Sequence, residues 1–222
     1  MKLTSLFSLF LLAALMFACG PEGEKVESSE ALAEAETTTA AAAYTVDPAM
    51  SIINWEGTKL VGGGHEGTIN ISSGRIALAN NNIVGGDFTV DMTSLANTDL
   101  EAGNGKEKLE GHLKSGDFFN VEEYPTATFN VVSAQPVPAG NEGPATHQVT
   151  GNFTMKGQTR SIAIPVIVSM DGDMLKIASN DFVIDRTEWG VNYGADGSVA
   201  DLAKDNIIND NVGLVLQIVA KK

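Results

Sequence analysis

The sequence predicts an all-β fold, and three observations support that prediction. Apolar side chains recur at every second position along most of residues 44–222, as in half-buried strands. Turn-forming pairs such as Lys156-Gly157 separate these runs, as expected for sequential antiparallel strands. Only Gly105 to Lys114 has helical spacing, with two leucines four residues apart among charged side chains.

The strands follow one another along the chain with short polar connections. The alternation is clear where Phe88, Val90 and Met92 share one face, and again where Phe153 and Met155 do. The other predicted strands are Ile52 to Leu60, Gly67 to Ile71, Arg75 to Ala79, Ala127 to Val132, Ser161 to Met170, Met174 to Ala178 and Val212 to Val219. This many strands with one apolar face must stack as a sandwich or close as a barrel, and periodicity leaves both open.

The short helix is expected to lie across an opening or seam of the sheet. It would position Phe118 and Phe119, which stand just beyond its end. Residues 44–222 are long enough to bury a large core, so we predict one domain there.

The composition argues against several functions. The chain has 28 Asp and Glu residues against 14 Lys and Arg, a formal net charge of −14. Nucleic acids favour clustered basic residues, so we expect no nucleic-acid partner. The histidines at 65, 112 and 147 are too scattered for a metal site, and no nucleophile or acid and base pair has a defined spacing. We therefore expect no metal, no cofactor and no enzymatic activity.

Residues 1–18 have the form of an export signal. Lys2 precedes an apolar run that is too short to cross a bilayer and ends in small residues. The segment Leu15-Met16-Phe17-Ala18-Cys19 resembles the lipobox of bacterial lipoproteins, which implies that Cys19 is acylated and holds the protein to a membrane. The alternative is cleavage elsewhere, with Cys19 a leftover thiol or part of an uncleaved anchor.

The chain after the signal gives two further expectations. Residues 19–43 are predicted to be the lipidated cysteine and a disordered acidic tether, because six Glu stand against one Lys and almost no large apolar side chain is present. Gly20 is not the Asp associated in some bacteria with retention at the inner membrane. We therefore expect a location in the cell envelope, at the outer membrane, facing the periplasm or the surface.

Several motifs, taken in order, are more specific than the alternation. The first is the run Gly116-Asp117-Phe118-Phe119-Asn120-Val121-Glu122-Glu123-Tyr124-Pro125-Thr126-Ala127-Thr128-Phe129. Two more are Val149-Thr150-Gly151-Asn152-Phe153-Thr154-Met155-Lys156-Gly157-Gln158-Thr159-Arg160 and Phe182-Val183-Ile184-Asp185-Arg186-Thr187-Glu188-Trp189-Gly190. Together they resemble the YceI-like family over residues 44–222. Met50 departs from the pattern, because the family commonly has His there.

The resemblance implies a lipocalin-like eight-stranded antiparallel β-barrel with one short helix, in an exported protein. Its apolar interior would hold a long isoprenoid or other amphiphilic lipid. The resemblance thus favours a barrel over a sandwich, and eight strands give an interior just wide enough for packed side chains or one slim ligand.

Within such a barrel the apolar faces become candidate cavity residues, although any one of them could belong to a packed core. The candidates are Trp55, Phe88, Val90, Met92, Phe118, Phe119, Phe129, Phe153, Met155 and Phe182. His65 and Arg186 are candidates for contact with a ligand headgroup. The alternatives are a structural hydrogen bond for His65 and an ion pair of Arg186 with Asp185 or Glu188.

Two hypotheses for function follow. In the first, an envelope lipoprotein binds or carries an isoprenoid lipid or quinone in its barrel. In the second, a structural or stress-related envelope protein has a barrel filled by its own side chains and binds no lipid. The sequence leaves open whether the domain forms a homodimer.

Overall fold

The computed structural model describes residues 20–33, 41–80, 82–138, 143–195 and 207–222. Cys19 lies outside the described residues, so its acylation stays a prediction. The elements of the described residues, in chain order, are β1 (Glu24–Lys25), β2 (Ser29–Glu30), β3 (Ala42–Val46), β4 (Ile52–Lys59), β5 (Gly64–Ala79), β6 (Asn82–Asn97), α1 (Lys106–Lys114), β7 (Thr126–Pro136), β8 (His147–Met155), β9 (Gln158–Asp171), β10 (Met174–Ser179), β11 (Phe182–Asp185), the 3₁₀ helix η1 (Arg186–Trp189) and β12 (Ile208–Lys221).

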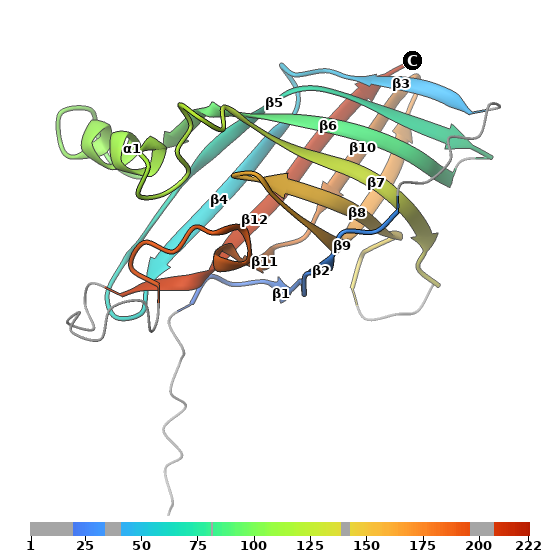
Figure 1. Cartoon of the computed structure of the whole chain (residues 1–222). Coiled ribbons are helices and arrows are strands. Elements are labelled where there is room, and N and C mark those ends of the chain that lie inside the picture. The colour runs from blue at the N-terminus through green and yellow to red at the C-terminus, as the bar shows by residue number, and fades with distance from the viewer. Residues whose placement is uncertain (1–19, 34–40, 81, 139–142, 196–206) are drawn as a thin grey trace, which may run out of the picture.

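The strands form one sheet that closes on itself (Figure 1). From β5 to β10 each strand pairs antiparallel with the next in the chain. β12 pairs with β10 and β11 on one side and with β3 and β4 on the other, and β3 and β4 both pair with β5. β3 and β4 together occupy one position in the ring, and β10 and β11 together occupy another. The ring therefore has eight strand positions. The predicted barrel is confirmed.

β5 is a single bent strand and not the two strands expected from the sequence. Its buried positions are odd-numbered up to Ile71 and even-numbered from Gly74, and the pairing register with β6 shifts between Ile71 and Ser73. A β-bulge absorbs the extra residue, so Ser72 and Ser73 are not a turn. Gly74 has no room for a side chain, because a Cβ there would lie 2.7 Å from the carbonyl oxygen of Asp87.

The helix and one tight turn follow the sequence expectations closely. Lys156 and Gly157, between β8 and β9, both have positive φ, at 49° and 72°. This is the backbone of a two-residue hairpin turn that matches the twist of its strands. α1 lies at one end of the barrel (Figure 1). Among the described residues no helix is long and apolar enough to cross a membrane.

Residues 20–33, here called the N-terminal arm, pack on the barrel, so the prediction of disorder is wrong for them. β1 pairs parallel with β11, and β2 pairs antiparallel with β9. Val26 is only 6% exposed and donates its amide to the carbonyl of Val183 at 2.9 Å. The side-chain amide of Asn152 holds both backbone groups of Leu32, at 2.9 and 2.8 Å.

The arm fills a seam in the barrel wall. The first half of β9 pairs with β8 on one edge, but β9 pairs with β10 only from Val166 onward. Among the described strands, the other edge of that half and the facing edge of β11 therefore have no partner in the ring. Such edges present unpaired backbone groups. β1 and β2 supply partners to both edges, which explains why a polar, acidic segment is ordered there.

We predict that Asn152→Ala loosens the arm without unfolding the barrel. The two hydrogen bonds to Leu32 would be lost, weakening arm attachment by about 1 kcal/mol. Hydrogen exchange at the Val26 amide should therefore accelerate, and proteolysis within residues 20–33 should be faster. Thr154→Ala is the matched control, because Thr154 is also on β8 and its hydroxyl bonds to the hydroxyl of Thr159 on β9. Equal exchange rates in the two variants would contradict the role assigned to Asn152 in holding the N-terminal arm.

Candidate functional site

The barrel encloses a cavity of about 160 Å³. Protein interiors are normally packed with few voids larger than a water molecule, whose share of the liquid is about 30 Å³. Side chains from every strand between β4 and β12 line this cavity, together with Leu113 of α1 and Phe119 just after it. Apart from Trp55 and Arg186, the lining side chains are all apolar. The interior is therefore not completely filled by the protein's own side chains.

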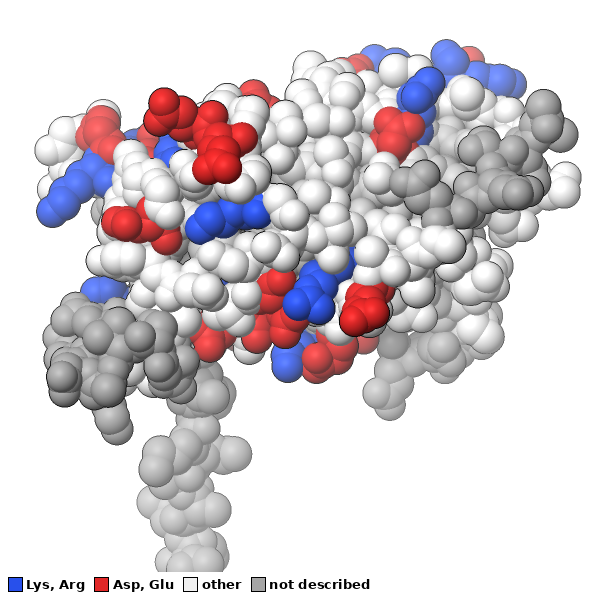
Figure 2. All heavy atoms as spheres, viewed as in Figure 1, with Lys and Arg blue, Asp and Glu red and all other residues white. Residues whose placement is uncertain are grey.

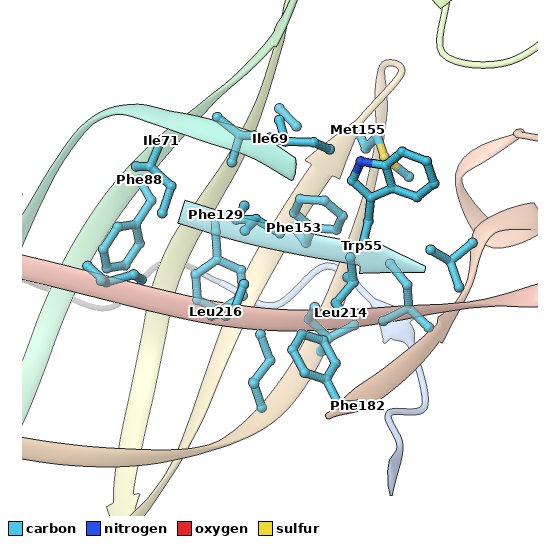
Figure 3. A pocket seen from close by; sticks show the side chains of 18 of the residues that line it. Trp55, Ile69, Ile71, Phe88, Phe129, Phe153, Met155, Phe182, Leu214 and Leu216 are labelled. Atoms are coloured by element: carbon cyan, nitrogen blue, oxygen red, sulfur yellow. The ribbon is translucent and has the colours of Figure 1, made fainter. Parts of the chain in front are cut away.

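Aromatic rings form one part of a mostly aliphatic cavity wall (Figure 3). Phe88 and Phe129 lie on neighbouring strands with their ring centres 6.4 Å apart and tilted by 41°. Phe153 lies edge-on to Trp189, at 5.3 Å. Spacings and tilts of this kind are favourable for aromatic pairs. They fix the rings against one another around the open space.

Three glycines in the strands make room for lining aromatics. A Cβ on Gly67 would lie 2.6 Å from the indole of Trp55, and one on Gly151 would lie 2.4 Å from the ring of Phe129. A Cβ on Gly74 would lie 2.9 Å from Phe88. Each ring thus lies over strand backbone where no side chain stands. The glycines position the aromatics, and their role is steric.

Nine of the ten cavity residues predicted from the sequence lie in this lining. Phe118 does not. Its ring packs instead against His112 and Tyr193, with centres 5.0 and 4.9 Å away. Two consecutive phenylalanines after α1 point in different directions, and only Phe119 enters the cavity. The helix does lie over one end of the barrel, as the sequence predicted.

Apart from Val90, the aliphatic residues that make up most of the lining were not predicted. It includes Ile53, Ile69, Ile71, Ile76, Ile162, Ile164, Val166, Ile177, Leu214, Leu216 and Ile218. The signal was present, because residues 212, 214, 216 and 218 alternate strictly in β12. The predicted residues were mainly aromatic or methionine, and the inward-facing aliphatic residues of the same strands were left out.

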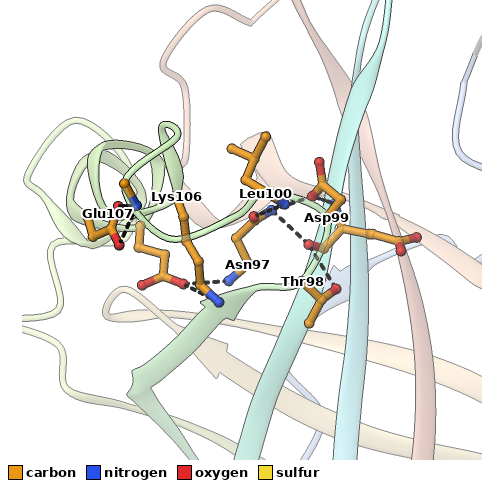
Figure 4. A network of polar contacts seen from close by, with 9 residues as sticks. Asn97, Thr98, Asp99, Leu100, Lys106 and Glu107 are labelled. Atoms are coloured by element: carbon orange, nitrogen blue, oxygen red, sulfur yellow. Dashed lines mark hydrogen bonds and ion pairs between the residues drawn. The ribbon is translucent and has the colours of Figure 1, made fainter.

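A buried asparagine connects α1 to the barrel wall (Figure 4). Asn97, at the end of β6, is fully buried. Its backbone amide donates to Glu110 of α1 at 2.8 Å, and its side-chain amide donates to the carbonyl of Glu66 at 2.9 Å. Its side-chain oxygen accepts from the amide of Leu100, also at 2.9 Å. The helix that contributes Leu113 to the cavity is thereby held at that end of the barrel.

His65 belongs to this network and not to the cavity, so its predicted headgroup role is not supported by its position. Its Nδ1 lies 2.9 Å from a carboxylate oxygen of Asp99. Burial raises the pKa of Asp99, but hydrogen bonds from the Glu66 amide, His65 and Asn97 outweigh it and lower the pKa to about 2. The carboxylate stays ionised, and His65 makes the structural hydrogen bond that the sequence left as the alternative.

Arg186 is also held structurally. It is 3% exposed, and its guanidinium donates to the backbone carbonyls of Val191, Ile208 and Asn209. Its ion-pair partner is Asp210, at 3.6 Å, and not Asp185 or Glu188 as the sequence alternative had it. Burial lowers the pKa of Arg186, while Asp210 and Asp185 oppose that shift. Although Arg186 borders the cavity, its donors connect η1 to the start of β12.

The two tryptophans differ in how their N–H groups are used. Nε1 of Trp189 donates to the carbonyl of Phe153 at 3.0 Å. Nε1 of Trp55 is buried, and among the described residues it has no hydrogen-bond partner. An indole nitrogen is a donor only. Although Trp55 lines the cavity, its N–H does not face the open space, and the surface open to the cavity is entirely apolar.

Comparison with known sequences identifies the family. A sequence model of the YceI-like domain matches residues 44–220. The chain belongs to the YceI-like family. This confirms the family resemblance carried by the motifs around Phe118, Gly151 and Trp189.

Individual relatives match this chain over only part of its length. A UPF0312 protein of Vibrio campbellii is 33% identical over 128 residues, which are 56% of this chain and 61% of the relative. A UPF0312 protein of Pseudomonas aeruginosa is 39% identical over 62 residues, 28% of this chain and 29% of the relative. The aligned part thus spans less than two thirds of these curated relatives.

Two solved structures share the fold. BcnA of Burkholderia cenocepacia has a TM-score of 0.60 at 23% identity, covering 79% of this chain and 99% of BcnA. A polyisoprenoid binding domain of Saccharophagus degradans, implicated in plant cell wall breakdown, has a TM-score of 0.55 at 16% identity. It covers 80% of this chain and 97% of that domain. These similarities support the barrel assignment.

We predict that Arg186→Lys destabilises the ligand-free protein. Lysine cannot reproduce the planar fork, so buried carbonyls would lose their donors and the free energy of unfolding should fall by about 2 kcal/mol. Arg160→Lys is the control, because its side chain is 37% exposed and pairs with Glu188 at the surface. That control should cost less than about 1 kcal/mol. Denaturant unfolding with the same loss in both variants would contradict the structural role of Arg186.

Proposed function

We propose that this YceI-like protein binds an isoprenoid or similarly elongated amphiphilic lipid inside its barrel. The observation that carries the proposal is the unfilled apolar cavity, lined from every strand between β4 and β12. The solved domain of Saccharophagus degradans, which has the same fold, is described as polyisoprenoid binding. A lipid tail is the ligand that such a lining favours, because it needs apolar contact and few polar partners.

Burial of the tail would supply the affinity. Each methylene removed from water contributes about 0.8 kcal/mol, so affinity would rise with the length of tail that is buried, without charged contacts. Met92 and Met155 add adaptable side chains to the wall. The protein would then sequester or carry the lipid, and it would need no catalytic group to do so.

We further propose that the protein works in the cell envelope, attached through acylated Cys19. The N-terminal arm gives this a geometric consequence. A Cβ on Gly20 would lie 3.1 Å from the side chain of Asn209, near the start of β12. The acyl chains would thus be attached one residue before the barrel, without the long tether that the sequence suggested. That arrangement keeps the cavity close to the membrane from which a lipid would come.

The cavity can be tested by filling it. Leu216→Trp places extra apolar bulk in the lining, so the lipid recovered by organic extraction and mass spectrometry should fall. Leu60→Trp is the control, because Leu60 is 41% exposed and outside the lining. If the barrel is instead close-packed at Leu216, the change should cost about 1 to 3 kcal/mol in delipidated protein. Unchanged lipid content with that loss would favour the side-chain-filled alternative.

The anchor is tested separately. Cys19→Ala should move the protein from the membrane fraction to the soluble fraction, because stable attachment requires acyl chains. The barrel should stay folded, which circular dichroism would check. Retention in the membrane fraction to the same extent as the parent would place the anchor elsewhere.

A further inference from the structure

The loop between β4 and β5 has an apolar tip. Its residues are Leu60-Val61-Gly62-Gly63, whereas hairpin tips are usually built from Gly, Asn, Asp and Ser. Leu60 is 41% exposed and Val61 is 53% exposed. A Cβ on Gly62 or Gly63 would have no atom within 4 Å apart from its chain neighbours. The tip therefore projects from the barrel and does not pack on it.

The apolar tip lies at the same end of the barrel as the beginning of the N-terminal arm. The amide of Leu60 donates to the carbonyl of Ile207 at 2.9 Å, just before β12. A Cβ on Gly20 would lie 3.1 Å from the side chain of Asn209, which is two residues or about 7 Å further along the same chain. The loop, the start of β12 and the start of the arm come together in Figure 1. An acyl group on Cys19, the residue before Gly20 in the sequence, would then be attached next to the tip.

A third exposed side chain lies on the other side of the β12 start. The amide of Ile208 donates to the carbonyl of Gly194 at 2.8 Å, on the edge of the strand opposite β4. The neighbouring Tyr193 is 45% exposed, and its ring packs on His112 and Phe118. A half-exposed tyrosine suits a membrane surface, because its ring is apolar and its hydroxyl is polar.

The side wall next to the tip is acidic. Glu22, Glu24 and Glu27 of the arm are exposed, and acidic side chains with a few basic ones line the lower edge of the molecule in Figure 2. Anionic lipids repel such a wall, and a carboxylate is costly to bury in an apolar layer. Lys59, next to Leu60, is exposed and could reach lipid phosphates while its stem stays among apolar groups. These charges favour contact with a membrane through the tip and not along the arm.

A lipid bilayer fits the apolar tip better than a second protein does. Stable protein interfaces bury roughly 800 Å² per partner, far more than two half-exposed aliphatic side chains offer. Insertion into a bilayer needs no such area once an anchor holds the protein at the surface, because the loop then acts at a high effective concentration.

We propose that Leu60 and Val61 insert into the membrane to which Cys19 is anchored and so orient the barrel on it. This inference rests on the proposed anchor and adds a second, independent contact. The start of β12 would lie at the bilayer and the end of β12 away from it. The end of the barrel where α1 lies, and where Leu113 borders the cavity, would then face the lipid.

The test uses the full acylated chain with one added cysteine. Val61→Cys and the control Met170→Cys each carry an environment-sensitive fluorophore, in vesicles of phosphatidylethanolamine and phosphatidylglycerol. Met170 is 44% exposed and lies at the opposite end, because it pairs with Leu175, which pairs with Ala220 near the end of β12. Lipids spin-labelled on their acyl chains should quench the fluorophore at position 61 at least about threefold more than the one at position 170.

A further substitution checks that the side chains of the tip, and not the fluorophore, cause insertion. Adding Leu60→Glu to Val61→Cys places a carboxylate in the tip, so quenching at position 61 should fall at least about twofold. Adding Met170→Glu instead should leave that quenching unchanged. Both sites are exposed, so circular dichroism should be the same for both variants.

Three outcomes would overturn the inference while leaving lipid binding and the anchor intact. Equal, weak quenching at both positions in membrane-bound protein would show that the tip stays in water. Quenching that survives Leu60→Glu would show that the tip side chains do not cause insertion. A blue-shifted emission at position 61 without quenching by lipid would place a second copy of the chain on the tip.

The unsubstituted protein tests the anchor itself. Cys19 is the only cysteine of the chain, and once acylated at its sulfur it takes up no fluorophore. Labelling of the unsubstituted protein would therefore overturn the proposed anchor and this inference with it.

Discussion

β12 pairs on both of its sides, and the cavity exists because of that closure. Once the ring is closed, the inward side chains of all its strands face a common interior. Closure also requires local irregularity. The bulge in β5 changes which side chains face inward partway along the strand, so Ile71 and Ile76 both reach the cavity although their numbers differ in parity.

The same closure leaves one weakness in the wall, which the N-terminal arm covers. Because β10 and β11 share one position in the ring, β9 separates from β11 and both would expose backbone groups. Backbone pairing, and not apolar burial, holds the arm there, with Val26 as its single buried large side chain. A lipid anchor at Cys19 would therefore act on a segment that is part of the barrel wall.

The sequence was sufficient for features that depend on neighbouring residues and insufficient for those that depend on segments distant in the chain. Alternation in β6, β8 and β12, the Lys156-Gly157 turn and α1 depend on neighbours in the chain, and all were predicted. The order of the arm depends on edges left open by β9 and β11, which are far away in sequence. An acidic segment with little apolar content gives no local signal of that kind.

The candidate site shows the same division. Phe88, Phe129 and Phe153 were predictable because inward positions on a strand follow from period two. Phe118 and Phe119 lie outside any strand, so periodicity could not tell which of them enters the cavity. His65 and Arg186 were the candidates for contact with a ligand headgroup, Arg186 because it stands among charged residues beside Trp189. The structure satisfies both with partners distant in sequence, Asp99 and the carbonyls around β12.

Engagement of the nearby charged groups by the protein itself leaves the cavity surface apolar. His65 bonds Asp99, Arg186 bonds the carbonyls around β12, and the surface open to the cavity carries no polar atom of the described residues. Apolar surface alone selects for length and shape, because the hydrophobic effect has no direction. A ligand of this cavity would therefore be recognised by how well its shape fits the lining, and any polar group it carries would have to lie outside the apolar interior, where it can still be hydrated.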